Sequence, residues 1–322
     1  MKTIDASRPA TASETGDVTV SICCLTHNHG AFIERALEGF LSQRTSFRYE
    51  VIVHDDASVD GASEVVRRWT ERYPSLVRSI VQPENQWSRG VNPFAAFIWP
   101  RIRGRYVALC DGDDYWTDPF KLAKQVDYLE RHPSCFGCFH PVRVVHDDDS
   151  QPEFVWPNAA AIPELFDGQT LTLDDLLTTN VIHAPSMVYR WRYHEDRYPG
   201  DLSKLLMPFD WFLHIQHAAR GPIGMIPDVM AVYRKHAGGA WWEATHDVTK
   251  LYRRFGIEYF RFFRECSRSL GRTVSEPRLS QTLSAIIRAY LVAGDGDSLK
   301  QIAELSPDDF SRGVARLLAA AE

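Results

Sequence analysis

Patterns of buried strands alternate with patterns of amphipathic helices from residue 18 to residue 131. The apolar runs are short and end in polar loops, and the segments between them repeat apolar residues at three- and four-residue spacing. This alternation is typical of a doubly wound α/β sheet with mostly parallel strands. The pattern predicts strands at 18–25, 49–54, 77–81 and 106–110, and helices at 31–42, 62–73, 92–98 and 121–131.

The second half of the chain has weaker periodicity. Its apolar runs predict strands at 134–145, 181–189 and 221–233, and its helical spacing predicts helices at 170–179 and 209–219. Residues 146–163 break the pattern and predict an irregular excursion. From 241 onward the chain is expected to be helical, at 244–270, 276–293, 297–304 and 308–321.

Composition narrows the class of protein. A net charge of -6 argues against general nucleic-acid binding, which favours a basic surface. No window approaches the roughly 18 uninterrupted apolar residues of a membrane span, so the sequence predicts a cytoplasmic protein that is soluble or peripheral at the inner membrane face.

Residues 1–16 are expected to be a disordered lead. The six cysteines lie mostly in apolar runs and are expected to be free thiols.

Three carboxylates follow the predicted strand at 106–110. Asp111, Asp113 and Asp114 repel one another unless a cation or hydrogen-bond donors neutralise them, and Mg2+ or Mn2+ takes carboxylate ligands. A solvated acidic turn before a helix capped by Asp118 is the alternative interpretation of this short pattern. Its place at the end of a buried strand favours a binding site, because ligands of open α/β sheets bind at such ends.

A second acidic pair, Asp55 and Asp56, follows the strand at 49–54. A carboxylate at this position of a nucleotide-binding sheet accepts hydrogen bonds from a base or a ribose, although a capped turn explains the pair as well. The loop after the first strand, 26–30, contains one glycine and is a weak phosphate cradle. Its two histidines, His27 and His29, are interpreted as loop or cap residues.

Three stretches together, Thr26-His-Asn-His, Val51 to Asp60 and Leu109 to Trp116, resemble family-two glycosyltransferases of the GT-A fold over about residues 18–240. The resemblance implies a largely parallel Rossmann-like mixed sheet at 17–240, with a nucleotide-binding half at 17–115 and an acceptor-binding half at 116–240, followed by a helical extension at 241–322. It places the donor at the residues Thr26, Asn28, Asp55, Asp56, Asp111 and Asp113. Among these, Asp113 is the implied ligand of Mn2+ or Mg2+, and the longer acidic run leaves Asp114 as a competing ligand.

Two further residues take roles from the same resemblance. Asp210 lies in the first turn of the helix expected at 209–219, where the family places the general base; complementarity with the helix dipole also explains an acid there. Glu195, Asp196 and Asp201 are lower-ranked bases. His236, followed by two glycines, stands where family members carry a histidine near the metal or the diphosphate.

The helix expected at 244–270 interleaves arginines with aromatic residues. A cap packed on the sheet is the favoured interpretation, and a peripheral membrane contact or a homodimer contact is the alternative.

The function predicted from these residues is inverting transfer of a sugar from a nucleotide diphosphate, UDP by preference, to a glycan, a lipid-linked glycan or a small-molecule hydroxyl. A sugar nucleotidyltransferase is a rival, although the loop at 26–30 lacks the glycine-rich basic sequence that binds a triphosphate. A catalytically silent sugar-binding or scaffold protein is the second rival, and the acids at 111, 113 and 210 argue against it.

Overall fold

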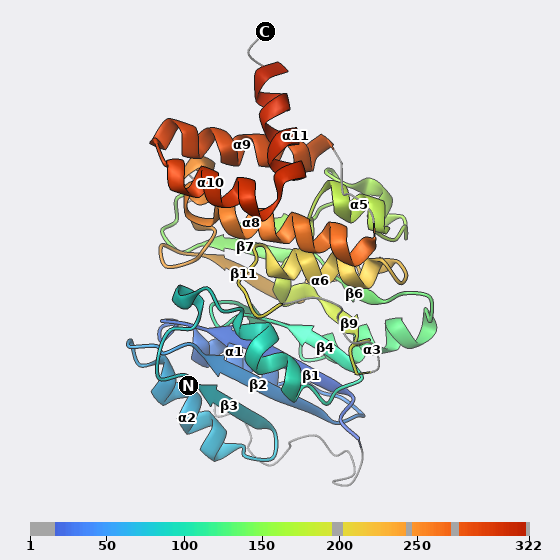
Figure 1. The fold of residues 1–322 in the computed structure, drawn as a ribbon. Coiled ribbons are helices and arrows are strands. Elements are labelled where there is room, and N and C mark those ends of the chain that lie inside the picture. Colours follow the sequence, from blue (N-terminus) through green and yellow to red (C-terminus); the bar gives the residue numbers. More distant parts are fainter. Residues whose placement is uncertain (1–16, 195–201, 243–246, 272–276, 320–322) are drawn as a thin grey trace.

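The computed structural model describes residues 17–194, 202–242, 247–271 and 277–319. The expected lead at 1–16 and the alternative bases Glu195, Asp196 and Asp201 lie outside these residues. The described part has a central sheet with helices on both faces and a helical region beyond it (Figure 1).

The central sheet has seven strands in the order β10-β6-β9-β4-β1-β2-β3. Adjacent strands pair in parallel except at β9, which runs antiparallel to both of its neighbours. This confirms the expected mixed, largely parallel sheet. The strands are β1 (Val20–Thr26), β2 (Tyr49–Asp55), β3 (Val77–Val81), β4 (Tyr106–Leu109), β6 (Gly137–Phe139), β9 (Val188–Arg190) and β10 (Ile223–Met225).

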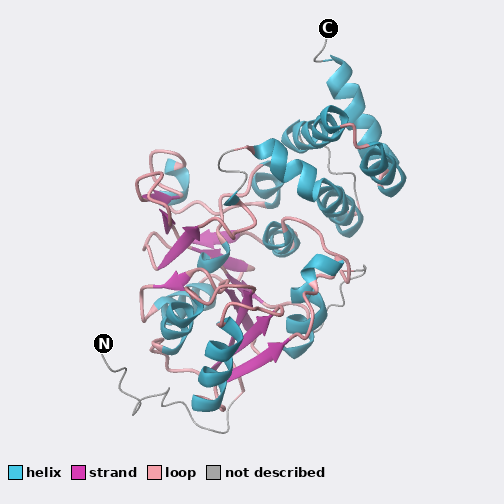
Figure 2. Cartoon of the chain, turned by 90° about the vertical axis from the view of Figure 1, so that its left-hand side faces the viewer, coloured by secondary structure: helices cyan, strands magenta, loops and turns pink. Residues whose placement is uncertain are grey.

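Helices cover both faces of this sheet because its strands are apolar on both faces. On β1, Ile22 and Cys24 are buried with the helices α1 (Ile33–Leu41), α2 (Ala62–Arg72) and α3 (Lys121–Arg131), whereas Cys23 belongs to the core on the other face. That second core contains α5 (Leu173–Thr178), α6 (Phe209–Ala218) and the short helical turns at 94–101. Figure 2 shows the helices on either side of the strands.

A second sheet of four strands, ordered β5-β11-β7-β8, lies beside the first. Its strands are β5 (Tyr115–Trp116), β7 (Val142–His146), β8 (Phe154–Trp156) and β11 (Ala231–Lys235). β5 follows the acidic loop directly, and β11 leads to His236. Pairing of β11 with β5 therefore brings His236 next to the acidic loop.

Three expected strands are divided in the structure. The strand expected at 134–145 is β6 and β7, separated at His140-Pro141, because proline cannot donate to a ladder and the chain changes sheets there. The run at 181–189 is a short turn of helix, Ala184–Ser186, before β9. The run at 221–233 is β10 and β11, again in different sheets. The excursion at 146–163 contains β8.

The helix after the acidic loop starts at Lys121, as expected, but its N-cap is Phe120 and not Asp118. The carboxylate of Asp118 accepts a hydrogen bond from the backbone N–H of Phe120 at 2.8 Å. Asp118 therefore holds the turn before the helix and does not cap it. The helix expected at 170–179 is α5, where Thr172 and Asp175 form a reciprocal capping box. The short helix α4 (Pro163–Phe166) precedes it.

The C-terminal region is helical, as expected. It contains α8 (Val248–Leu270), α9 (Pro277–Ala293), α10 (Gly296–Leu305) and α11 (Pro307–Ala319). The aromatic residues of α8, among them Phe255, Phe260 and Phe263, are buried in the same core as α6 and α9. This burial favours the cap interpretation, because these side chains are not available to a membrane or to a second copy.

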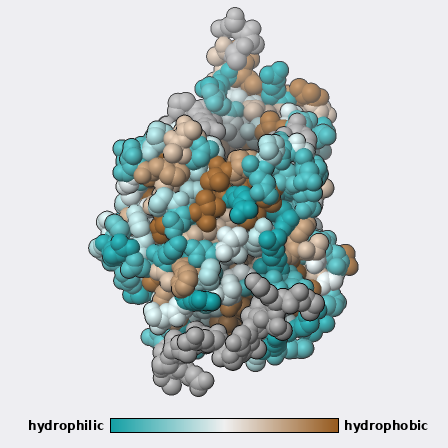
Figure 3. Space-filling view, turned by 180° about the vertical axis from the view of Figure 1, so that it is seen from behind, coloured by the Kyte–Doolittle hydropathy of each residue, from teal (hydrophilic) through white to brown (hydrophobic). Residues whose placement is uncertain are grey.

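The rear face of the molecule is mostly hydrophilic, with a hydrophobic cluster near its middle (Figure 3). Among the described helices, none combines the length and the apolar character needed to cross a bilayer. All six cysteines are buried and free, which confirms the expectation for the thiols.

Candidate active site

The candidate site lies where the adjacent parallel strands β1, β2 and β4 end. Thr26 at the end of β1 is in register with Asp55 at the end of β2, and β4 pairs with the opposite side of β1. The acidic loop after β4 is fastened to β1, because the N–H of Gly112 donates to the carbonyl of Leu25 at 2.8 Å. The three loops that carry the predicted donor residues therefore meet at one edge of the sheet, as parallel strand ends do.

Gly112 allows the acidic loop to lie directly on β1. A Cβ at this position would be 2.7 Å from Oγ1 of Thr26 and 2.9 Å from Cδ1 of Ile33, which is too close for any side chain. The hydroxyl of Thr26 is buried and has no hydrogen-bond partner in the structure. This hydroxyl lies where the strands end, and a bound donor would supply the hydrogen bond that it lacks.

Three side chains form a cluster suited to a metal ion. His29, Asp113 and His236 each offer one ligand atom, and these atoms lie within 4.8 Å of one another. Nε2 of His236 is 3.1 Å and Nε2 of His29 is 3.8 Å from Oδ2 of Asp113. They come from the loop after β1, the loop after β4 and the end of β11. Two imidazoles and one carboxylate fit Mn2+ well and Mg2+ less well, because Mg2+ prefers oxygen ligands.

The protonation states of this cluster suit a cation. Burial lowers the pKa of His29, which keeps its imidazole neutral and able to bind a metal. Burial opposes the charge of Asp113, but the hydrogen bond from His236 and the electrostatic interaction with the two neighbouring imidazoles outweigh burial and lower the pKa of Asp113. Nδ1 of His236 accepts a hydrogen bond from the N–H of Gly238 at 3.3 Å, so Nε2 holds the proton that a metal would replace.

Asp111 and Asp210 are the other two carboxyl groups of the site. Burial raises the pKa of Asp111, and the charges of Asp113 and Asp210 raise it further. Burial also raises the pKa of Asp210, to about 6, while the N–H of Trp211 donates to its Oδ1 at 2.8 Å. The effect of the Asp210 charge on Asp111 indicates that α6 brings Asp210 near the acidic loop, although the two residues are far apart in the chain.

Asp114 has a structural role. Its side chain is 2% exposed, and its Oδ1 accepts a hydrogen bond from the backbone N–H of Arg234 at 2.8 Å. The guanidinium of Arg234 also donates to the carbonyl of Asp113 at 3.1 Å. Asp114 therefore joins the acidic loop to β11, and it is not part of the group His29, Asp113 and His236. Which of the two carboxylates binds a metal stays a prediction.

Asp55 and Asp56 both hold loops. The carboxylate of Asp55 is fully buried and accepts hydrogen bonds from the hydroxyls of Ser58 and Ser63. Asp56 accepts from the backbone N–H groups of Gln86 at 2.8 Å and Trp87 at 2.9 Å. Their predicted contact with the nucleoside stays a prediction, and any such contact must use acceptor capacity left by these bonds.

Asn28 connects the loops after β1 and β2. Its backbone φ is 55°, its N–H donates to the hydroxyl of Ser58 at 2.8 Å, and its Oδ1 accepts from the N–H of Val59 at 2.9 Å. Asn28 thus fixes the shape of the site edge. Its direct contact with the donor stays a prediction.

His29 is interpreted from the sequence as a loop or cap residue, whereas the structure brings it to Asp113 and His236. The sequence contains a signal for this contact. His29 follows β1, the strand adjacent to β4, so it lies at the same edge of the sheet as the acids. The contact itself depends on β11 returning beside the acidic loop.

Known proteins resemble this chain over most of its length. Uncharacterized protein Rv1520 of Mycobacterium tuberculosis is 42% identical over 233 residues, which cover 72% of this chain and 63% of the relative. The match thus spans less than two thirds of the length of that relative.

Two solved structures share the fold. The mannosyltransferase PcManGT from Pyrobaculum calidifontis, in complex with GDP-Man and Mn2+, has a TM-score of 0.54 at 19% identity, covering 98% of this chain and 83% of that one. S. aureus TarS 1-349, in complex with UDP-GlcNAc, has a TM-score of 0.55 at 17% identity, covering 92% and 89%. The family model described as glycosyl transferase family 2 matches residues 21–237, and this chain belongs to that family.

Proposed function

We propose that this protein is a metal-dependent inverting glycosyltransferase that transfers a sugar from a nucleotide diphosphate, UDP by preference, to an acceptor hydroxyl in glycan biosynthesis. The observation that supports it most strongly is the convergence of His29, Asp113 and His236, beside Asp111 and Asp210, at the ends of β1 and β4. Residues 17–115 would bind the nucleotide, and residues 116–240 would form the acceptor side.

Asp210 is the proposed general base. A base must be deprotonated at the working pH and yet retain affinity for a proton, and a pKa raised to about 6 by burial meets both conditions near neutrality. Attack of the acceptor oxygen on the anomeric carbon forms one bond as the bond to the diphosphate oxygen breaks. Asp210 receives the hydroxyl proton, and the anomeric configuration inverts.

His29, Asp113 and His236 would hold the metal. When bound there, Mn2+ would supply Lewis-acid neutralisation of the departing diphosphate. Asp111 would contact a ribose hydroxyl or the diphosphate side of the donor; burial, and then the charges of Asp113 and Asp210, raise its pKa. The unpaired hydroxyl of Thr26 would add one hydrogen bond at the same edge.

The test is release of nucleotide diphosphate from a panel of UDP-, GDP- and dTDP-sugars, with Mn2+, with Mg2+ and after chelation. We expect release with Mn2+ from one donor class, loss after chelation, and loss in Asp113→Asn. Asp228→Asn serves as the matched control, because this carboxylate is exposed and pairs with Lys124 away from the cluster.

Two other results would contradict the proposal in different ways. Donor binding by calorimetry without turnover, with a full set of hydroxyl acceptors present, would indicate a silent sugar-binding protein. Release of pyrophosphate from a nucleoside triphosphate and a sugar phosphate would indicate a nucleotidyltransferase.

A further inference from the structure

A second concave site lies at the opposite edge of the central sheet. It is a groove of about 1000 Å³, lined by residues at the amino ends of the parallel strands and at the carboxyl end of the antiparallel strand β9. The candidate active site occupies the other edge, so the two sites do not share residues. The lining contains six arginines, no lysine and one carboxylate, Asp17; the arginines are Arg48, Arg103, Arg105, Arg190, Arg192 and Arg220.

At two of these arginines, Arg190 and Arg103, the positive charge exceeds the negative charge of the carboxylates paired with it among the described residues. The guanidinium of Arg190 donates to the carbonyls of Cys135 and Leu129 and to the hydroxyl of Tyr106, all of them uncharged. None of the ion pairs within the described residues includes Arg190. Its charge is therefore solvated by neutral groups and keeps its attraction for an anion.

Arg103 is the second arginine at which positive charge exceeds negative charge. Its guanidinium pairs with Glu50, but Glu50 also pairs with Arg78 at 2.7 Å, so two cations share one buried carboxylate. The side chain of Arg103 remains 55% exposed and that of Arg105, paired with Glu130, 58% exposed. Both therefore present donors to the groove while their carboxylate partners hold them in place.

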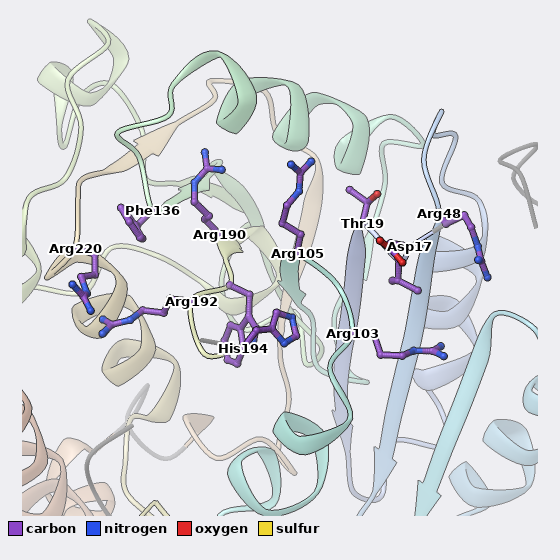
Figure 4. Close-up of a pocket in the computed structure, with 12 residues that line it drawn as sticks. Asp17, Thr19, Arg48, Arg103, Arg105, Phe136, Arg190, Arg192, His194 and Arg220 are labelled. Atoms are coloured by element: carbon purple, nitrogen blue, oxygen red, sulfur yellow. The ribbon is translucent and has the colours of Figure 1, made fainter. Parts of the chain in front are cut away.

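The residue type and its distribution define the ligand. Arginine presents a planar fork of donors that matches phosphate oxygens, and it is the residue preferred where such recognition is specific. Figure 4 shows the guanidinium groups spread along the groove, from Arg220 and Arg192 at one end to Arg48 at the other. A spread of this kind suits several phosphate groups in one ligand better than a single ion.

We propose that this groove binds a discrete anion with two or more phosphate groups, at a site independent of the metal cluster. The concave shape favours a discrete ligand over a flat anionic membrane. The proposal does not depend on the transferase activity, because it uses a different edge of the sheet and a different set of residues.

The test is isothermal calorimetry with inorganic tripolyphosphate and metal-free protein in a chelating buffer, where the acidic cluster repels phosphate. We expect saturable binding under these conditions. The double variant Arg105→Gln, Arg220→Gln should weaken binding by about tenfold or more, since it removes two charge-assisted contacts. Arg220→Gln alone, at an exposed position, should weaken it by a smaller factor and guards against misfolding of the double variant.

The matched control is Arg67→Gln, Arg131→Gln, which removes the same charge from exposed positions on α2 and α3 and should leave the affinity unchanged. Absence of tripolyphosphate binding, or equal weakening in the control, would overturn the proposal. So would binding to vesicles rich in anionic lipid without binding to tripolyphosphate, because the source of phosphate would then be a membrane surface.

Discussion

Individual carboxyl groups of this site differ in what surrounds them. Asp113 has histidine partners that lower its pKa, whereas burial raises the pKa of Asp111 and Asp210, and none of the ion pairs among the described residues includes either acid. In the proposed function, this difference suits Asp113 as a charged metal ligand and Asp210 as a carboxylate that exchanges a proton near neutral pH.

The first prediction concerns the pH dependence of transfer. Because Asp210 must be deprotonated to act as base, kcat should fall about tenfold per pH unit below about pH 6. Asp210→Asn should reduce kcat by roughly 10²–10⁴-fold and remove this limb, with donor affinity retained. Rates measured from pH 5 to 8 with saturating donor check it. An unchanged limb in the variant would assign the titration to another group.

The second prediction concerns stability at the same residue. The pKa of Asp210 in the folded protein, about 6, lies above its ordinary value. The side chain therefore makes its full contribution to the free energy of unfolding below the ordinary pKa, and this contribution is lost as the pH rises through about 6. Asp210→Asn should therefore be more stable than the wild type at pH 7, by roughly 1–3 kcal/mol, and should show no gain near pH 4. Urea unfolding at both pH values measures this, and a gain of equal size at both would exclude the electrostatic cause.

The third prediction separates His29 from an ordinary loop histidine. His29→Ala should weaken Mn2+ binding by about tenfold or more. Loss of a hydrogen bond that supports a metal ligand has an effect of this size, and loss of the ligand itself should have at least as large an effect. His132→Ala is the control, because His132 lies on the surface at the end of α3. Mn2+ titration followed by electron paramagnetic resonance gives the affinities. Equal affinities in the two variants would remove His29 from the site.

Among the elements, α8 and α9 pack unusually closely at a glycine. A Cβ on Gly256 would lie 2.6 Å from Cγ2 of Ile286 and 2.6 Å from Oη of Tyr290, both on α9. Gly256 thus sets the separation of the two helices that form the base of the C-terminal cap. The arrangement explains why a glycine occurs in the interior of a helix, where it costs roughly 1 kcal/mol relative to alanine.

The fourth prediction follows from that contact. Gly256→Val should destabilise the protein by about 1–3 kcal/mol, because its methyl groups force α8 and α9 apart. Gly296→Val is the matched control, since nothing lies within 4 Å of a Cβ at that position. Thermal unfolding of both variants measures the difference. Similar melting temperatures would show that the helices adjust without cost.

At the scale of the whole molecule, folding brings acidic groups together from distant parts of the chain, and a cation with a diphosphate would offset their repulsion. Binding to the folded state alone raises the free energy of unfolding in proportion to the logarithm of ligand concentration. Ligand binding and stability are therefore linked in this fold.

The fifth prediction is that linkage. Mn2+ with UDP, at about 100 times the dissociation constant, should stabilise the wild type by about 2.7 kcal/mol and raise its melting temperature. Asp113→Asn should lose most of this shift, whereas Asp228→Asn should keep it. Differential scanning calorimetry with and without ligand decides between the outcomes. A shift retained in Asp113→Asn would place the ligand elsewhere.

The sequence by itself determined the elements that local patterning controls. The apolar runs of β1, β2 and β4, the helices between them and the acids at their ends follow from periodicity and turn chemistry. Asp113, His236 and Asp210 are site candidates from the sequence alone. The resemblance of three stretches to a family supplied their roles, and the roles of individual residues remain predictions.

Only the tertiary structure decided the contacts made by pairing between distant strands. His29 joined the metal cluster because β11 returns beside β5, Asp114 became a structural acid because Arg234 reaches it, and β6 and β7 separated because the chain changes sheets at Pro141. The arginine groove likewise combines residues from 48 to 220. Sequence spacing does not encode such contacts, because each depends on which strands become neighbours in the sheet.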